Sequence, residues 1–270
     1  MGKRDSSMRI ALGVEYDGTA YNGWQRQRNG TGVQTILERA LAKVADADVE
    51  VVCAGRTDAG VHAEAQVVHF DSTATRSRRA WVLGVNSNLP PDVNAQWAEF
   101  VADDFDARYS ATSRTYRYLI LNRATRSALY RDRAWWIHRP LDEMRMRDAA
   151  AHLLGEHDFS AFRAAGCQAL TPNREIFTLI VERHAEWLAV SVRANAFLQH
   201  MVRNIVGVLV AIGTGDEEPG WASQVLESRD RTRGGMTAPA HGLTLIEVRY
   251  PEGAGIRAPA ASTLVSLPRP

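Results

Sequence analysis

The chain lacks what several classes of protein require. Its 270 residues include two cysteines, Cys53 and Cys167, which are too few for a disulfide framework and lack the spacing of a metal site. The longest apolar run, residues 205–213, is too short to span a bilayer. The first residues are polar and show no apolar signal segment. Together these absences predict a protein of the reducing cytoplasm.

Lysine is nearly absent as well. Lys3 and Lys43 are the two lysines among 32 basic residues, and the net charge of +1 does not by itself indicate a nucleic-acid partner. Residues 108–147, however, hold ten arginines against three acids, a local balance of +7, with six tyrosines and tryptophans interleaved. Arginine binds phosphate and stacks on bases, and aromatic rings offer stacking platforms. A GC-rich genome explains the preference for arginine but not the local excess of charge, so this segment predicts contact with RNA.

The order of expected elements repeats along the chain. In the first half, alternating apolar residues predict strands, and apolar residues three and four apart predict helices. In the order strand, helix, strand, strand, helix, strand, these elements cover residues 9–16, 33–44, 49–52, 66–70, 78–85 and 93–101. This is the β-α-β-β-α-β order of a ferredoxin-like or RRM-like unit.

The second half repeats this order loosely. We expect a strand over residues 112–121 and a helix over residues 141–154. A hairpin of two strands follows over residues 176–184 and 187–195, then a helix over residues 197–213 and a final strand over residues 242–250. We therefore predict an α+β fold of two such units, whose antiparallel sheets join around a central cleft. The predicted domains are residues 1–106 and 107–252, the second completing the active-site cleft. Residues 1–8 and 253–270, the latter rich in Pro, Ala and Ser, are expected to be loose ends.

A polar triplet bounded by glycines lies between two expected strands of the first domain. Arg56, Thr57 and Asp58 are consecutive, with Gly55 before them and Gly60 after. Glycine permits positive φ and the close approach of another backbone, and a loop held by two core strands is a usual place for chemistry. Taken alone, the triplet favours a simpler interpretation, an aspartate that caps a turn beside an exposed arginine.

The residues around the triplet resemble a known family. Residues 55–62, Gly-Arg-Thr-Asp-Ala-Gly-Val-His, are similar to the signature loop of the TruA-type pseudouridine synthases. Six further segments resemble segments of the same family and follow one another in the same order as in that family. They are residues 15–18, 23–27, 86–90, 105–108, 114–118 and 197–207. Small departures at Thr115 and residues 123–126 fall where the family varies, so they leave the implied chemistry intact.

The resemblance implies an enzyme and a substrate. It implies an isomerase that converts uridine to pseudouridine at positions 38, 39 and 40 of the tRNA anticodon stem-loop, working as a homodimer with Asp58 as the catalytic residue. Breaking the C1′–N1 bond, turning the base and joining C5 to C1′ involves no redox step and no external group, so we expect no cofactor. The target base must be flipped out of the folded RNA. Three routes stay open for the Asp58 carboxylate, which are attack on C1′, attack on C6 and abstraction of the 2′ proton.

A buried arginine is expected to accompany Asp58. The helix expected over residues 197–213 is apolar nearly all round, which predicts burial, yet it carries Arg203. A buried guanidinium needs a carboxylate partner. The residues alone leave open whether Arg203 pairs with Asp58, pairs with another acid, or snorkels to the surface. The resemblance favours Asp58, because the family has an arginine at this place in its last long helix beside the catalytic aspartate.

Other side chains are expected to bind the substrate. Tyr116 lies on an expected strand, and the resemblance implies that its ring stacks on uracil while its hydroxyl assists acid–base steps. The alternative is a half-buried structural tyrosine. Arg56 is expected to enter the RNA stack and hold the flipped base out, and His62 to shape the loop by hydrogen bonding. The residues assigned to substrate binding are Tyr116, Arg56, Arg76, Arg108, Arg114 and Arg126.

Two other functions remain open. A non-catalytic RNA-binding module of two RRM-like units predicts aromatic ribonucleoprotein-type consensus strands, which the sequence lacks. A base-excising hydrolase would cleave the same bond but release free uracil. A standard glycosidase needs two carboxylates astride the bond, whereas the signature loop supplies one.

Overall fold

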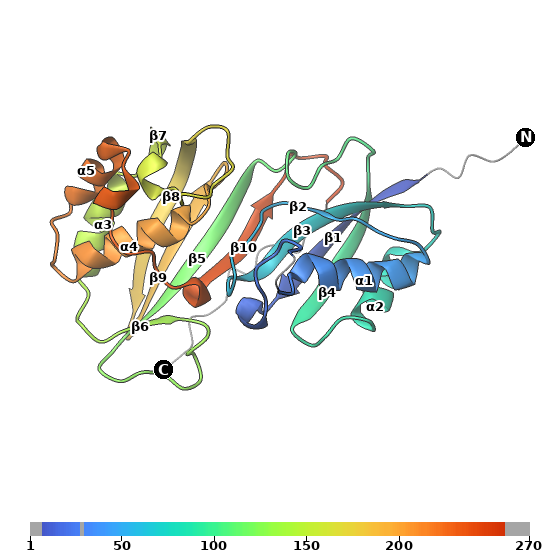
Figure 1. The fold of residues 1–270 in the computed structure, drawn as a ribbon, viewed down its shortest axis with the longest axis horizontal. Coiled ribbons are helices and arrows are strands. Elements are labelled where there is room, and N and C mark those ends of the chain that lie inside the picture. The colour runs from blue at the N-terminus through green and yellow to red at the C-terminus, as the bar shows by residue number, and fades with distance from the viewer. Residues whose placement is uncertain (1–6, 28–29, 257–270) are drawn as a thin grey trace, which may run out of the picture. The chain divides into compact units, whose positions relative to one another are not determined.

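The computed structural model describes residues 7–27 and 30–256, which fold into two compact units (Figure 1). The first unit contains the described residues up to Thr112 together with residues 245–256, and the second contains Ser113–Thr244. Of the loose ends expected at residues 1–8 and 253–270, residues 1–6 and 257–270 lie outside the described residues, and Met8 already belongs to the first strand. Within the described part, no helix combines the length and apolar character needed to cross a bilayer.

The first unit has the predicted β-α-β-β-α-β order. Its elements are β1 (Met8–Tyr16), the short 3-10 helix η1 (Gly18–Ala20), α1 (Val33–Ala45), β2 (Val52–Cys53), β3 (His62–Ser72), α2 (Arg78–Asn86) and β4 (Val93–Val101). β1 pairs antiparallel with both β3 and β4, and α1 and α2 pack against each other beside this sheet (Figure 1). The expected strand over residues 49–52 is reduced to the two residues of β2, and β3 is longer than expected.

Packing explains why these residues form these elements. In α1, apolar residues at helical spacing, among them Val33, Leu37 and Leu41, are fully buried. β1 is the central strand and buries residues on both of its faces. Gly13 in β1 leaves room for a large ring, because a Cβ at this position would lie 2.0 Å from Nε1 of Trp97.

The second unit repeats the order with additions. Its elements are β5 (Ser113–Asn122), β6 (Trp135–Ile137), α3 (Glu143–Ala151), β7 (Gly155–Asp158), η2 (Ser160–Phe162), β8 (Asn173–His184), β9 (Trp187–Ala194), α4 (Met201–Gly213), α5 (Trp221–Ser228), η3 (Arg231–Arg233) and η4 (Ala240–Gly242). The strands lie in the order β5-β9-β8-β7, and β6 adds to β5 in parallel. The predicted hairpin is confirmed as β8 and β9, whereas the sequence missed β6, β7 and α5. The α+β fold class is confirmed.

The helix that carries Arg203 is shorter than predicted. It starts at Met201 rather than at residue 197, because His200 has φ of 63° and cannot continue a right-handed helix. Most of its residues are buried, as its apolar sequence predicted. Gly207 allows another segment to approach closely, since a Cβ there would lie 1.8 Å from the carbonyl oxygen of Met236.

The last strand, β10 (Leu243–Arg249), differs from its expected placement. It neighbours β3, and residues 245–256 pack with the first unit, although we assigned residues 242–250 to the second domain. The first unit also extends to Thr112 instead of residue 106. Strand order follows long-range pairing, which local patterns do not report. The predicted domain limits, residues 1–106 and 107–252, stay a prediction, and the packing units differ from them at these two places.

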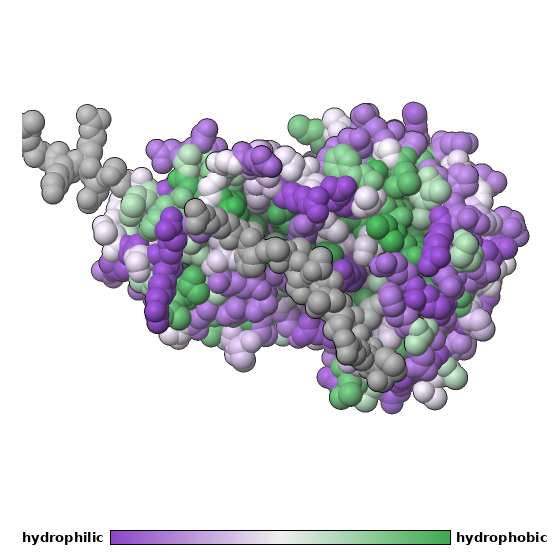
Figure 2. Space-filling model, turned by 180° about the vertical axis from the view of Figure 1, so that it is seen from behind, coloured by the Kyte–Doolittle hydropathy of each residue, from purple (hydrophilic) through white to green (hydrophobic). Residues whose placement is uncertain are grey.

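The surface mixes polar and apolar side chains. Figure 2 shows hydrophilic and hydrophobic residues interspersed on the face that it presents. Among the exposed large hydrophobic residues are Phe177 and Ile180 on β8, at 38% and 48% exposure. The guanidinium of Arg193 on β9 lies 5.4 Å from the ring centre of Phe177 and covers part of it. Singly exposed apolar residues of this kind are normal and carry no functional argument.

Candidate active site

The loop that carries Asp58 connects β2 and β3 in the first unit. Cys53 pairs with Val68, and the amide of Ala54 donates to the carbonyl oxygen of Val67 at 2.8 Å. After this bond the chain leaves the ladder and returns at His62, where β3 begins. The predicted placement of the polar triplet between two strands is therefore confirmed.

Backbone hydrogen bonds hold the peptide groups on both sides of Asp58. The carbonyl oxygen of Thr57 accepts from the amide of Trp24 at 3.0 Å, and that of Asp58 accepts from the amide of Val61 at 3.1 Å. Gly60 has φ of 78°, a left-handed conformation that favours glycine. Because both flanking peptides are tied, the backbone at Asp58 is held in one conformation.

Buried polar side chains support the same loop from below. The hydroxyl of Tyr16 lies 2.8 Å from Oγ1 of Thr57, and the amide of Gln66 donates to the carbonyl oxygen of Gly55 at 2.6 Å. Nδ1 of His62 accepts from the amide of Gly18 at 3.0 Å, which ties the end of the loop to η1, and the loop-shaping role of His62 stays a prediction. All three supporting side chains, Tyr16, Gln66 and His62, are buried.

Exposure differs sharply within the triplet. Arg56 is exposed, Thr57 is buried and Asp58 is partly exposed. The buried Thr57 side chain anchors the loop to the unit, while its two neighbours reach the surface. A carboxylate and a guanidinium thus emerge from one rigid turn, separated by an anchored residue.

The cysteine next to this loop is not a competing nucleophile. Burial raises the pKa of the Cys53 thiol to about 12, and the nearby charges of Arg56 and Arg108 oppose only part of that effect. The thiolate is the reactive form of cysteine, so Cys53 stays an inert neutral thiol at physiological pH.

Tyr116 lies in the second unit, on β5 opposite Val192 of β9. Its side chain is 7% exposed, and its ring meets that of Phe197 edge to face, with centroids 5.2 Å apart and an interplanar angle of 89°. Phe197 belongs to the turn before α4 that the sequence assigned to the helix itself. The edge-to-face contact restrains the plane of the Tyr116 ring, and its stacking on uracil stays a prediction.

Replacing Tyr116 separates the ring from the hydroxyl. Tyr116→Phe keeps the packing against Phe197 and any base stacking, whereas Tyr116→Leu removes both. We expect the leucine variant to lose about 1–3 kcal/mol more in transition-state or RNA-binding free energy than the phenylalanine variant, the contribution of one stacked base. Steady-state kinetics with tRNA measure this difference. Equal losses would assign the role to the hydroxyl, and no loss in either would make Tyr116 structural.

Arg203 is the third residue of α4 and is only partly buried. Its Nε donates to the carbonyl oxygen of Ala238 at 2.8 Å, a bond within the second unit that directs the guanidinium along the segment before β10. The pairing of Arg203 with Asp58 stays a prediction.

The other predicted substrate-binding arginines differ in exposure. Arg76, Arg108 and Arg126 are exposed, and the guanidinium of Arg108 lies 5.3 Å from the ring centre of Tyr109. Arg114 is 8% exposed and donates from Nη1 to the carbonyl oxygen of Asn195 at 2.9 Å. A phosphate contact at Arg114 stays a prediction, but this buried side chain does not belong to the surface set.

The charge excess counted over residues 108–147 is partly neutralised by acids from other segments. Ion pairs join Arg123 to Glu186 at 3.2 Å, Arg139 to Asp216 at 2.8 Å and Arg145 to Glu218 at 3.2 Å. Tertiary pairing thus reduces the local balance that the linear count suggested.

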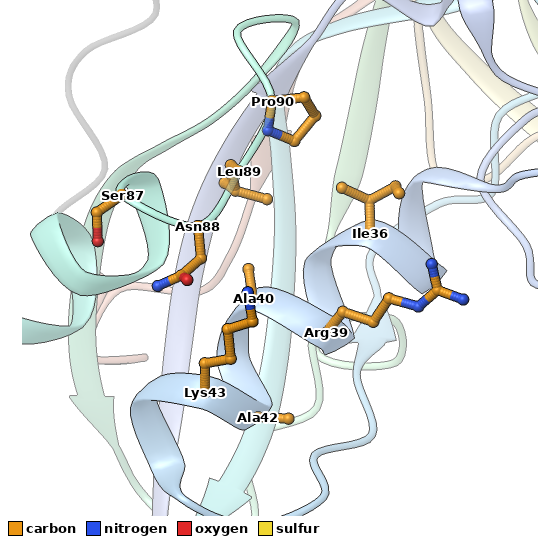
Figure 3. A pocket seen from close by; sticks show the side chains of 9 residues that line it. All are labelled: Ile36, Arg39, Ala40, Ala42, Lys43, Ser87, Asn88, Leu89 and Pro90. Atoms are coloured by element: carbon orange, nitrogen blue, oxygen red, sulfur yellow. The ribbon is translucent and has the colours of Figure 1, made fainter.

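A surface groove of about 680 Å³ lies elsewhere in the first unit, between α1 and the connection from α2 to β4 (Figure 3). Arg39 and Lys43 on α1 line one side, and Leu89 and Pro90 line the other. None of the predicted site residues lines this groove, so it is not the candidate active site.

Sequence reasoning missed the residues that support the loop, above all Gln66 and Tyr16. A signal was present, because Gln66 stands next to the apolar pair Val67 and Val68 in an expected strand, and a buried amide must find hydrogen-bond partners. Its partner Tyr16 lies 50 positions away in the chain, which no local pattern reveals.

Known proteins resemble this chain over most of its length. The family described as tRNA pseudouridine synthase matches residues 13–110 and 149–251. The protein named tRNA pseudouridine synthase A from Coxiella burnetii (strain Dugway 5J108-111) is 56% identical to this chain over 243 residues, which cover 90% of this chain and 93% of that protein. The corresponding protein of Alcanivorax borkumensis shares 55% over 245 residues, covering 90% and 92%. That of Vibrio campbellii shares 52% over 249 residues, covering 92% and 94%.

A solved structure, an archaeal box H/ACA sRNP Nop10–Cbf5 complex, matches 87% of this chain and 47% of that chain with 10% identity and a TM-score of 0.36, too low to support an argument. The family match and the relatives agree with the resemblance carried by residues 55–62. The chain belongs to the tRNA pseudouridine synthase family and is an isomerase that converts uridine in tRNA to pseudouridine.

Proposed function

We propose that this enzyme modifies uridines 38, 39 and 40 of the tRNA anticodon stem-loop and that Asp58 is its reacting carboxylate. The observation that carries the proposal is the Asp58 loop, in which a partly exposed carboxylate lies on a backbone tied at both flanking peptides. A fixed carboxylate suits each of the three routes open to it, since all require one oxygen to be aimed at one substrate atom.

The atoms of the reaction balance within the nucleotide. The C1′–N1 bond breaks, C1′ joins C5, the C5 hydrogen leaves as a proton and N1 gains one. Arg56, exposed two residues before Asp58, would occupy the space that the flipped base leaves in the stack. Tyr116 would stack on the extruded uracil, and Arg203 would balance the charge of Asp58. The enzyme would act as a homodimer in the cytoplasm, where its tRNA substrate resides.

The proposal is tested by incubating the protein with an isolated anticodon stem-loop RNA and mapping carbodiimide adducts at each uridine. We expect adducts at positions 38, 39 and 40 and no release of free uracil. Adducts confined to other uridines of the stem-loop would overturn the assigned positions, and free uracil would indicate a base-excising hydrolase.

The pairing of Arg203 with Asp58 is tested by stability rather than by turnover. Arg203→Met, Asp58→Asn and the double variant form a cycle in the free energy of unfolding. We expect a coupling of about 0.5–3 kcal/mol, because removing one partner leaves the other charge uncompensated and removing both does not. Urea unfolding monitored by circular dichroism gives the four values. Additive losses would mean that Arg203 pairs elsewhere.

Exposed arginines should make RNA affinity depend on salt despite the net charge of +1. Neutralising Arg108 and Arg126 to glutamine should lower the slope of log affinity against log salt by up to about two, one for each lost phosphate contact. Arg139→Gln serves as the control, because Asp216 already compensates Arg139. Fluorescence anisotropy with labelled tRNA measures the slopes. Equal slopes in all three proteins would place the RNA on another surface.

A further inference from the structure

The side chain of Gln66 continues the β2–β3 ladder beyond the point where its backbone bonds end. The last backbone bond of the ladder joins the amide of Ala54 to the carbonyl oxygen of Val67. At the next residue, the Gln66 side chain donates from Nε2 to the carbonyl oxygen of Gly55 at 2.6 Å, and Oε1 accepts from the amide of Gly55 at 3.4 Å. The fully buried amide thus takes the place of a peptide group and holds the first residue of the Asp58 loop.

The same amide reaches a second residue of the loop through Tyr16. An amide has two N–H groups, and the other one points to the Tyr16 hydroxyl at 3.4 Å. That hydroxyl lies 2.8 Å from Oγ1 of Thr57. The Tyr16 phenol carries a single proton, and either of the two hydroxyls can donate in the bond between them. Burial also raises the pKa of Tyr16, so the phenol keeps this proton. One chain of hydrogen bonds therefore links Gln66, Tyr16 and Thr57.

Thr57 transmits this constraint to Asp58. Its side chain is held by Tyr16 and its carbonyl oxygen by the amide of Trp24, so the peptide that leads into Asp58 has little freedom. We infer that Gln66 and Tyr16 are positioning residues of the isomerase, which aim the Asp58 carboxylate through Thr57. The inference rests on the proposed role of Asp58 and adds residues that touch neither substrate nor reacting atoms.

Two variants each break the chain by removing one hydroxyl. Tyr16→Phe removes the hydroxyl that bonds to both Gln66 and Thr57, and Thr57→Val removes the hydroxyl that bonds to Tyr16, with little change of shape in either case. We expect each to lower kcat about 10- to 100-fold while KM for tRNA stays within about threefold, because a misplaced carboxylate slows the reaction without weakening RNA binding. Thr57→Ser keeps the hydroxyl and should retain more activity than Thr57→Val.

The double variant Tyr16→Phe with Thr57→Val distinguishes positioning from general damage. If the two hydroxyls act as one chain, the double variant should be no slower than the slower single variant. Tyr250→Phe is the matched control, since it removes another tyrosine hydroxyl of the same unit, bonded to the carbonyl oxygen of Ala107 at 2.7 Å. We expect this control to keep the wild-type kcat.

Hydrogen exchange gives a readout that does not depend on catalysis. The amides of Trp24 and Val61 donate to the carbonyl oxygens of Thr57 and Asp58, so they should exchange faster in Tyr16→Phe than in Tyr250→Phe. The inference is overturned if kcat of Tyr16→Phe stays within twofold of wild type, if the losses of the two single variants multiply in the double variant, or if both amides stay fully protected. Two results together would separate this inference from the proposed function. If Asp58→Asn is active while the amides of Trp24 and Val61 lose protection in Tyr16→Phe, the role of Asp58 fails but the hydrogen-bond chain stands.

Discussion

Asp58→Asn should abolish turnover and leave affinity for tRNA nearly unchanged. The amide has the size of the carboxylate and keeps the same backbone ties, but it is neither a nucleophile nor a base. We expect kcat to fall by more than about 1,000-fold, as is usual when the reacting group of an enzyme is removed. Release of tritium from tRNA labelled at uridine C5 measures turnover, because the C5 hydrogen must leave when C5 joins C1′.

Asp71→Asn is the matched control for this experiment. Asp71 lies on β3 of the same unit, and its carboxylate pairs with Arg9 at 2.8 Å, so this variant removes an acidic group without touching the Asp58 loop. The control should turn over at close to the wild-type rate. Turnover by Asp58→Asn within tenfold of wild type would remove Asp58 from the mechanism.

Gly23→Ala should produce the second large loss, although residue 23 contributes no reactive group. Gly23 has φ of 86°, and a Cβ there would lie 2.7 Å from the carbonyl oxygen of Thr57 and 3.0 Å from the backbone of Asp58 and of Ala59. These contacts are with backbone, which cannot turn aside as a flexible side chain does. The methyl group should therefore push the Asp58 loop outward, and a displacement of about 1 Å corresponds to roughly a 100-fold loss in kcat.

The control for Gly23→Ala isolates crowding from backbone strain. Gly215 has a similar φ of 80°, but no atom lies within 4 Å of its added Cβ. Gly215→Ala should cost about 1–2 kcal/mol of stability from its left-handed conformation and leave kcat unchanged. Measuring kcat and Tm of both variants shows whether crowding of the Asp58 loop or backbone strain causes the loss of activity. The crowding argument fails if both variants show the same kcat.

The Asp58 loop combines exposed side chains with buried side chains that hold it in place. Arg56 and Asp58 reach the surface, whereas the residues that hold them, among them Tyr16 and Gln66, are buried in the first unit. Buried amides and hydroxyls are costly unless they are bonded, and here they bond to the loop. The Asp58 loop should thus be sensitive to substitutions at the buried residues that support it.

Local sequence patterns determined the elements and the candidate loop. Period-2 and period-3.6 spacing located β1, α1, α2, β4 and the hairpin of β8 and β9, because each pattern reports which face of one element is buried. Residues 55–62 located the candidate site because a rigid Gly-bounded turn must be encoded by residues next to one another. Taken alone, Arg56, Thr57 and Asp58 favoured a turn-capping aspartate, and the resemblance of residues 55–62 to the family made Asp58 the candidate.

Only the tertiary structure decided which distant residues meet. It reduced the local charge excess by pairing Arg123, Arg139 and Arg145 with acids remote in sequence, and it placed β10 beside β3. It also joined Gln66 and Tyr16 beneath Thr57. Such contacts are set by how strands pair and cores pack across the whole chain, so their free energy depends on partners that no stretch of neighbouring residues contains.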